Sequence, residues 1–284
     1  MTKQKTFLRN VVAVAICLAG TTMFSGCDNG NDPNEQTGKL VSRVSFSYIG
    51  GGDDFAEVTS ANSVFKYDDQ NRIIEIADYF ILAIGKKATF TYSANEMKMI
   101  AGFNGGGDTE WNGKIDYTAQ LDENGFIKSA VSIWRNLDTN EEDVVSWTAT
   151  YSNGFLNKLT YPDRTTNFTW NNGNLVKIET QAYGETETLN ISYDYTLENN
   201  LTNLDINWTT NVAYWYLDDM LEPLVLPQLE FFGQRSKNLI KKVTITFSGG
   251  YESETYNYQY KFDKNGVLTN CYIDDIFVFE FDYK

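Results

Sequence analysis

Apolar and polar side chains alternate with a period of two along most of this chain, and this alternation restricts the fold more than any other feature. In residues 115–121, Ile, Tyr, Ala and Leu alternate with Asp, Thr and Gln. The pattern recurs in residues 44–48, 145–151, 189–195, 256–262 and 277–283. A period of two places the apolar set on one face of a β-sheet and the polar set on the other. The sequence therefore predicts antiparallel strands with one face on a core and one face in water.

The segments between these strands share a form: an aromatic residue or Leu, one or more polar residues, Asn or Gly, and then an aliphatic residue. Segments of this form are residues 65–73, 121–127, 149–156, 168–175 and 262–268. Asn and Gly adopt positive φ at little cost, so each segment is predicted to be a β-hairpin turn. Aspartates in the turns favour turn chemistry over Ca²⁺ binding, because the full EF-hand spacing is missing. The hairpins look like YD-type repeats of secreted bacterial proteins, but their irregular period predicts a meander.

Residues 40–284 are predicted to form a single all-β domain. We expect an antiparallel meander that closes into a soluble barrel or a strongly curved sheet. Alternation by itself does not distinguish this from a membrane barrel, whose faces alternate with the opposite sign. The polar faces carry charges, as at Lys261 and Glu280, and the apolar faces carry Tyr in mid-strand. Both features favour a barrel that stands in water.

The first residues predict an export signal with a lipid attachment site. Lys3, Lys5 and Arg9 precede a short apolar run, which ends in Phe-Ser-Gly before Cys27. This order resembles a bacterial lipobox, although Phe24 replaces the usual Leu. Residues 1–26 are then a lipoprotein signal peptide, and residues 27–39, which lack large apolar side chains, are a flexible tether. We expect a cell-envelope protein, anchored by lipid at the outer membrane on its periplasmic or surface face.

Cysteine and histidine usage excludes several kinds of chemistry. Cys17 leaves with the signal and Cys27 takes the lipid, so Cys271 remains alone and is expected to be buried and inert. The chain contains no histidine, which excludes Ser-His-Asp systems and typical zinc sites. No nucleotide-binding loop is present. We therefore predict no catalytic residue, no metal site and no cofactor.

The chain is acidic. Loss of the signal removes three basic residues and leaves 20 basic against 38 acidic residues, a net charge of −18. Such a surface repels nucleic acid, so nucleic acid is not an expected partner.

One segment, residues 212–232, breaks the alternation. It is rich in Tyr, Trp and Leu, and Pro223 and Pro227 restrict any helix in it to short pieces. We predict one helical insert near residues 211–236, with Asn211 as a possible cap. The segment is either a plug that completes the core or a binding surface. The candidate binding surface consists of Tyr214, Trp215, Tyr216, Phe231 and Phe232.

The motif Phe-Phe-Gly-Gln-Arg-Ser-Lys-Asn-Leu at residues 231–239 resembles one found in an uncharacterised family of Bacteroidetes lipoproteins with a porin-like fold. The lipobox, the tether, the hairpin at residues 65–73 and the aromatic last strand match the same pattern. Ile240 stands where the family often has Pro. The resemblance implies a porin-like strand arrangement for residues 40–284 and implies no activity.

Three classes of function remain open. The first is a lipid-anchored binding protein for a glycan, a peptide or a small apolar ligand. The second is a structural or accessory envelope protein that binds another protein through residues 212–232. The third is a carboxylate-dependent hydrolase, for which Asp53 and Asp54 are the most loop-like acidic pair. The membrane, through the anchor, is the one partner that the sequence identifies.

Overall fold

The computed structural model describes residues 40–48, 59–77, 80–81, 83–105, 112–199, 202, 204–210, 229–248, 252–274 and 276–284. The strands within these residues are β1 (Val41–Tyr48), β2 (Thr59–Tyr67), β3 (Ile73–Ala77), β4 (Phe80–Ile81), β5 (Ala83–Tyr92), β6 (Glu96–Gly105), β7 (Asn112–Leu121), β8 (Ile127–Asn136), β9 (Glu142–Ser152), β10 (Phe155–Thr160), β11 (Arg164–Asn171), β12 (Asn174–Ala182), β13 (Glu185–Glu198), β14 (Asn238–Phe247), β15 (Glu254–Phe262), β16 (Leu268–Ile273) and β17 (Phe277–Tyr283). A short helix α1 (Ile206–Thr209) and a 3-10 helix (Leu229–Phe232) follow β13.

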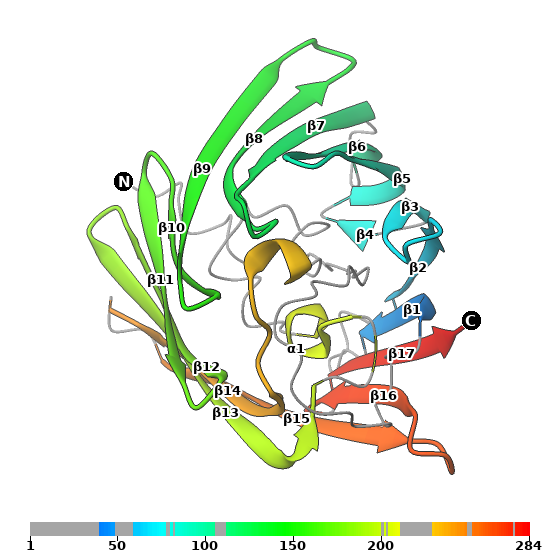
Figure 1. Cartoon of the computed structure of the whole chain (residues 1–284), viewed down its shortest axis with the longest axis vertical. Coiled ribbons are helices and arrows are strands. Elements are labelled where there is room, and N and C mark those ends of the chain that lie inside the picture. Colours follow the sequence, from blue (N-terminus) through cyan, green and yellow to red (C-terminus); the bar gives the residue numbers. More distant parts are fainter. Residues whose placement is uncertain are drawn as a thin grey trace.

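The strands form one antiparallel meander that closes on itself (Figure 1). Consecutive strands pair, except that β3 and β4 share one position and both pair with β5, so the described strands occupy sixteen positions. An even number of positions lets the first and last strands meet antiparallel. β1 and β17 pair from Val41 opposite Tyr283 to Tyr48 opposite Phe277. The all-β, antiparallel, closed barrel that the alternation predicts is therefore confirmed.

The apolar face of the wall points inward. On β7, Ile115, Tyr117 and Ala119 are buried, and Lys114 and Asp116 on the other face are partly exposed. At the closing seam, the rings of Phe46 and Phe279 lie 5.1 Å apart. Burial of these side chains drives closure, since each large apolar side chain contributes about 1.5–3 kcal/mol.

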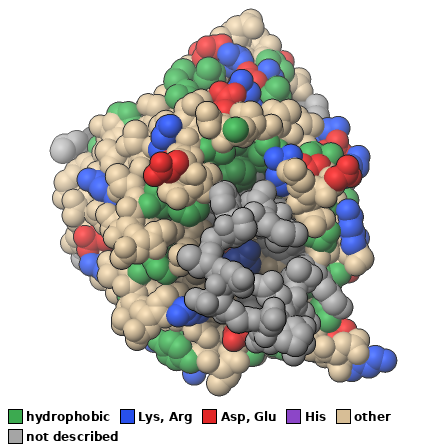
Figure 2. Space-filling view, in the orientation of Figure 1, with side chains coloured by type: hydrophobic (Ala, Val, Ile, Leu, Met, Phe, Trp, Pro, Cys, Tyr) green, Lys and Arg blue, Asp and Glu red, His purple; other side chains and the backbone are tan. Residues whose placement is uncertain are grey.

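The outer face of the wall carries charges and ion pairs. Glu75 on β3 accepts from Lys66 on β2 and from Lys87 on β5. These two lysines lower the pKa of the Glu75 carboxyl. Acidic and basic side chains are scattered over the visible surface in Figure 2. A polar outer face is the reverse of the apolar band that surrounds a transmembrane barrel. Among the described helices, none is long and apolar enough to cross a bilayer.

The hairpin turns use the chemistry that the sequence predicts. In the turn after β7, Asp122 Oδ1 accepts from the main-chain N–H groups of Asn124 and Phe126. Asp68 and Asp263 accept in the same way in the turns after β2 and β15. Asn-Gly pairs form the turns at residues 153–154 and 172–173, where both residues have positive φ. The interpretation of these aspartates as turn residues is confirmed.

A repeated hydrogen bond joins neighbouring hairpins at one end of the barrel. An aromatic side chain on the rim side of one strand donates a hydrogen bond to a main-chain carbonyl oxygen. The acceptor is an aliphatic residue near the start of the neighbouring strand that comes before it in sequence. The donors Tyr67, Tyr92, Tyr151, Trp170, Tyr193, Tyr260 and Tyr283 reach Val41, Ile73, Ile127, Leu156, Leu175, Ile240 and Leu268, respectively, at 2.5–2.8 Å. Leu121 occupies the remaining equivalent position and has no group to donate. We call this end of the barrel the aromatic rim.

Chain from β13 enters the barrel at this rim and fills part of the interior (Figure 1). Helix α1 is wholly buried and begins at the N-cap Asp205, whose side chain accepts from the N–H of Trp208. Asn207 ties α1 to β14 by donating to Asn238 O and accepting from Ile240 N, at 2.7 and 2.8 Å. Burial raises the pKa of Asp205, although the Arg235 guanidinium partly offsets this effect.

Two details differ from the sequence-based expectations. Tyr195 was expected on the apolar face with Tyr193, but it is 72% exposed, because the pairing of β13 with β14 is interrupted between Asp194 and Glu198. The described α-helix lies just before the predicted insert and is capped by Asp205. The 3-10 helix lies inside the predicted range, and Asn211 lies outside the described residues.

Removal of a rim hydroxyl should destabilise the barrel. Tyr193→Phe deletes the hydrogen bond to the buried Leu175 carbonyl, so we expect a loss of roughly 1–3 kcal/mol in the free energy of unfolding. Denaturant unfolding of the purified protein measures this change. Tyr183→Phe is the control: it deletes an 86% exposed hydroxyl bonded to Asp163 and should change stability by less than about 0.5 kcal/mol. Equal effects of the two variants would contradict the proposed role of the rim.

Asp205 should make the barrel less stable as the pH rises. Its pKa is raised above 3.8 by burial, so the folded protein holds this proton more tightly than the unfolded chain does. The free energy of unfolding of the wild type, relative to Asp205→Asn, should fall as the pH rises from 3.8 through the folded pKa. Asp194→Asn is the control of opposite sign, because hydrogen bonds from Thr196 lower the pKa of Asp194. Relative to that variant, the stability of the wild type should rise with pH below 3.8. Unfolding curves at several pH values test both slopes.

Candidate functional site

The motif at residues 231–239 lies across two hairpin turns of the aromatic rim. We call residues 231–238 the strap. Gln234 N–H donates to Gly154 O at 2.8 Å, and Lys237 N–H donates to Gly173 O at 3.0 Å. Gly233 has φ +85°, and a Cβ at this position would lie 2.3 Å from Gly154 O. Glycine is therefore required where the strap crosses the turn between β9 and β10.

Two aromatic residues of the strap anchor it to the barrel. Phe232 is only 2% exposed and stacks on Trp147, with ring centroids 5.7 Å apart. Phe231 is half-buried and stacks on Tyr92 at 5.8 Å. The burial of Phe232 places its ring in the core, so this residue offers no surface to a ligand in the structure.

The polar residues of the strap satisfy buried main-chain groups. The Arg235 guanidinium contacts the carbonyl oxygens of Asn199, Thr202 and Leu204, each at 3.3 Å. The Ser236 hydroxyl accepts from Leu175 N–H at 3.0 Å. Buried carbonyl and N–H groups need such partners. This motif therefore has a structural role, which is to hold the inserted chain in the barrel.

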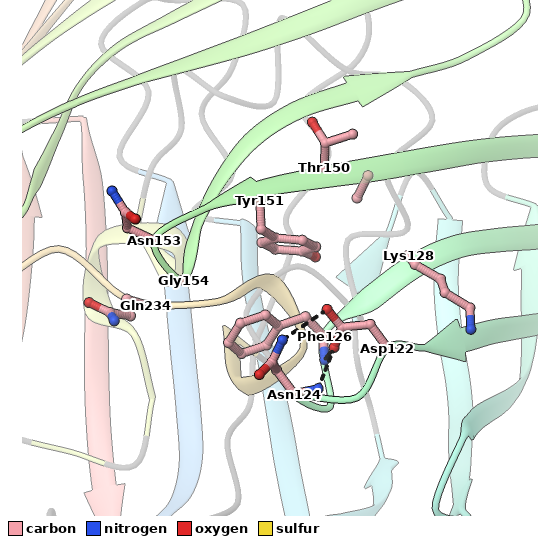
Figure 3. Close-up of a pocket in the computed structure, with 10 residues that line it drawn as sticks. Asp122, Asn124, Phe126, Lys128, Thr150, Tyr151, Asn153, Gly154 and Gln234 are labelled. Atoms are coloured by element: carbon pink, nitrogen blue, oxygen red, sulfur yellow. Dashed lines mark hydrogen bonds between the residues drawn. The ribbon is translucent and has the colours of Figure 1, made fainter. Parts of the chain in front are cut away.

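A groove opens beside the strap, between the β7–β8 turn and the β9–β10 turn. Its volume is about 630 Å³. The residues that line it are Asp122, Asn124, Phe126, Lys128, Ala149, Thr150, Tyr151, Asn153, Gly154 and Gln234. Figure 3 shows the side chains of both turns and of the strap around this space. The groove is the candidate functional site.

An aromatic pair forms one wall of the groove. The rings of Phe126 and Tyr151 lie 5.0 Å apart and are tilted by 38° (Figure 3). The Tyr151 hydroxyl donates to Ile127 O at 2.8 Å and contacts Phe231 O at 3.1 Å, which fixes its ring. Burial raises the pKa of this hydroxyl, so Tyr151 stays protonated at neutral pH. The pair is a rigid, uncharged surface.

The polar side chains of the groove suit binding better than acid–base catalysis. Asp122 is the one carboxylate among the described lining residues, and its Oδ1 already closes the turn. A glycosidase needs two carboxyl groups on opposite sides of a bond. Within the described ranges, no group of three or more His, Cys, Asp or Glu residues could hold a metal ion.

The structure tests few of the predicted site residues. Cys27, Tyr214, Trp215 and Tyr216 lie outside the described residues, as do Asp53 and Asp54. The lipid attachment and a contact surface at residues 214–216 therefore stay predictions. Cys271 is buried as expected, and burial raises the pKa of its thiol to about 12.

Sequence reasoning did not identify the groove. It recognised residues 121–127 and 149–156 as separate turns, and it treated residues 231–239 as a family motif. The signal that could have found the site is a phenylalanine directly after the Asp122 turn, at the same place as Arg72 and Val267 in the equivalent turns.

No family model and no curated protein matches this chain. Its structure is similar to the crystal structure of a porin-like protein from Bacteroides uniformis, with 13% sequence identity and a TM-score of 0.58. The match covers 86% of this chain and 98% of that chain. A porin-like protein from Bacteroides vulgatus matches with 11% identity and a TM-score of 0.45, over 87% of this chain and 99% of that chain. The first similarity shows that the chain has the porin-like barrel fold.

Proposed function

We propose that this chain is a lipid-anchored binding protein of the cell envelope. The anchor is Cys27, at the outer membrane on its periplasmic or surface face, and the ligand binds at the aromatic rim. The predicted signal and tether support the location. The similarity to porin-like barrels supports an association with the envelope.

The observation that carries the proposal is the groove beside the strap. The outer wall carries charged side chains and ion pairs, and the inner wall is packed with buried side chains. The groove of about 630 Å³ at the rim combines an aromatic wall with exposed amides. Pockets that bind ligands combine an apolar surface with a few polar groups that fix orientation.

Leu40, the first described residue, lies at this same rim. Lys284 N–H donates to Leu40 O, and Tyr67 donates to the adjacent Val41. A tether of residues 27–39 reaches at most roughly 45 Å when it is extended. The point of the rim at Leu40 would thus stay within this distance of the membrane.

A second candidate function is an accessory protein that binds another protein through residues 212–232. Phe231 and Phe232 contact the barrel wall in the structure, so this surface would rest on Tyr214, Trp215 and Tyr216. A carboxylate-dependent hydrolase is less favoured, since the groove has one carboxylate among its described lining residues.

Replacing Cys27 should abolish anchoring. Cys27→Ser lacks the thiol that accepts the lipid, so the protein should leave the membrane fraction or accumulate with its signal uncut. Fractionation and immunoblotting check this expectation. Cys17→Ser changes a cysteine inside the predicted signal and should still be found in the membrane fraction. A processed Cys27→Ser protein that still sediments with membranes would refute the anchor.

Filling the groove should abolish ligand binding. A ligand that binds the folded state raises the unfolding temperature. We expect a polysaccharide, peptide or lipid fraction of the envelope to raise this temperature for the full mature protein. Thr150→Trp, which fills the groove from β9, should remove the shift. The control, Thr244→Trp on the outer face of β14, should retain it. If no fraction shifts the wild type, or if Thr150→Trp responds like the wild type, binding at this groove is wrong.

A further inference from the structure

We propose that the groove binds a neutral carbohydrate. The Phe126 ring is the stacking platform, and Asp122, Asn124, Asn153 and Gln234 bind the sugar hydroxyl groups. This inference rests on the proposed function and adds the chemical class of the ligand.

Comparison of three equivalent turns of the rim shows how the turn that lines the groove differs from the others. They begin at Asp68, Asp122 and Asp263, and in each of them the first aspartate oxygen accepts two main-chain N–H groups. In the first turn, Arg72 donates to Asp68 Oδ2 and covers the Tyr92 ring at 4.7 Å. Arginine therefore occupies both the carboxylate and the aromatic face of that turn.

In the second turn, Phe126 replaces the arginine. Asp122 Oδ2 receives a long contact of 3.4 Å from the Asn124 side-chain amide, so it can still accept from a ligand. In the third turn, the equivalent residue is Val267, which has no aromatic face. Of these three described turns, the one at Asp122 alone has an aromatic side chain at this position, next to the carboxylate that closes the turn.

The platform is pre-organised. The Phe126 ring is half-buried, and its neighbour Tyr151 is held by two carbonyl oxygens. The C–H groups on one face of a sugar ring pack favourably on an aromatic face. A rigid platform loses little conformational entropy on binding.

The polar side chains match a ligand whose groups both donate and accept. Asn124, Asn153 and Gln234 are exposed, and each amide offers both a donor and an acceptor. A carboxylate such as Asp122 accepts strong hydrogen bonds from hydroxyl groups. Sugar hydroxyl groups can use all of these partners.

Other ligand classes fit the groove less well. An apolar ligand would leave the amides and the carboxylate unpaired, at a cost in free energy. An anion would meet Lys128, but it would also meet the carboxylate of Asp122 and a chain with an excess of acidic residues. A peptide strand would need a free sheet edge, and this barrel is closed by the pairing of β1 with β17. A neutral saccharide meets none of these penalties.

The test is isothermal titration calorimetry of the full mature protein with neutral hexasaccharides of glucose, xylose, mannose and N-acetylglucosamine. We expect at least one to bind the wild type and Phe126→Ala to weaken this binding about tenfold. Phe126→Leu keeps the apolar bulk without the aromatic face and should lose affinity as well. Val267→Ala, at the equivalent position of another turn, should bind within about twofold of the wild type. Asp122→Asn should weaken binding, whereas Asp263→Asn should not.

The outcomes separate this inference from the proposed function. If no hexasaccharide binds, or if both Phe126 variants bind like the wild type, the carbohydrate inference is overturned. If, in that case, a peptide or lipid fraction still stabilises the wild type but not Thr150→Trp, the proposed binding function stands without it. If no fraction acts at all, both fail.

Discussion

The barrel depends on a hydrogen bond that is repeated around one end. Each aromatic donor lies near the rim end of one strand and donates to a carbonyl oxygen near the start of the strand before it. Examples are the bonds from Tyr283 to Leu268 and from Tyr67 to Val41. The bond thus adds a side-chain contact to the main-chain ladder between two neighbouring strands, and it joins each hairpin of the rim to the hairpin before it. It also lets the aromatic rings pack inside the barrel while their hydroxyl or indole N–H groups keep a hydrogen-bond acceptor, which buried tyrosine and tryptophan side chains need. At the seam itself, the main-chain ladder between β1 and β17 and the hydrogen bond from Lys284 N–H to Leu40 O close the barrel.

A barrel of sixteen positions is too wide for wall side chains to fill by themselves. The chain after β13 enters this space, and its polar main chain then needs partners within the barrel. Arg235, Asp205 and Asn207 provide them for α1 and the residues around it. Burial of Asp205 is unfavourable for its ionised form, and this cost is tolerated because the carboxylate caps α1. A wide barrel thus needs inserted chain to fill its interior. The inserted chain in turn needs the strap, whose side chains bind its main-chain groups.

The fold could be predicted from the sequence where local chemistry decides it. The alternation correctly predicted which side chains of β7 and β17 face the core, and the Asn-Gly pairs predicted the turns after β9 and β11. Prediction failed at Tyr195, because a break in pairing depends on the partner strand and not on local pattern. It also failed to find the groove, because Asp122, Asn153 and Gln234 meet only after the barrel has closed. No local signal indicates that the main chain of the strap bonds to the turns at Gly154 and Gly173.

The equivalent position of three similar rim turns carries three different side chains, and we relate this difference to function. Arg72, Phe126 and Val267 occupy one place in three turns with the same hydrogen bonds, so the turn itself does not require any of them. Arginine closes its turn by binding Asp68, and valine presents a small apolar surface. Phenylalanine beside Asp122 leaves both an aromatic face and a carboxylate oxygen accessible. Gln234 of the strap lines the same groove as Asp122 and Phe126. Because the hydrogen bonds of the turn form without these side chains, their combination at one turn agrees with the carbohydrate site that we propose.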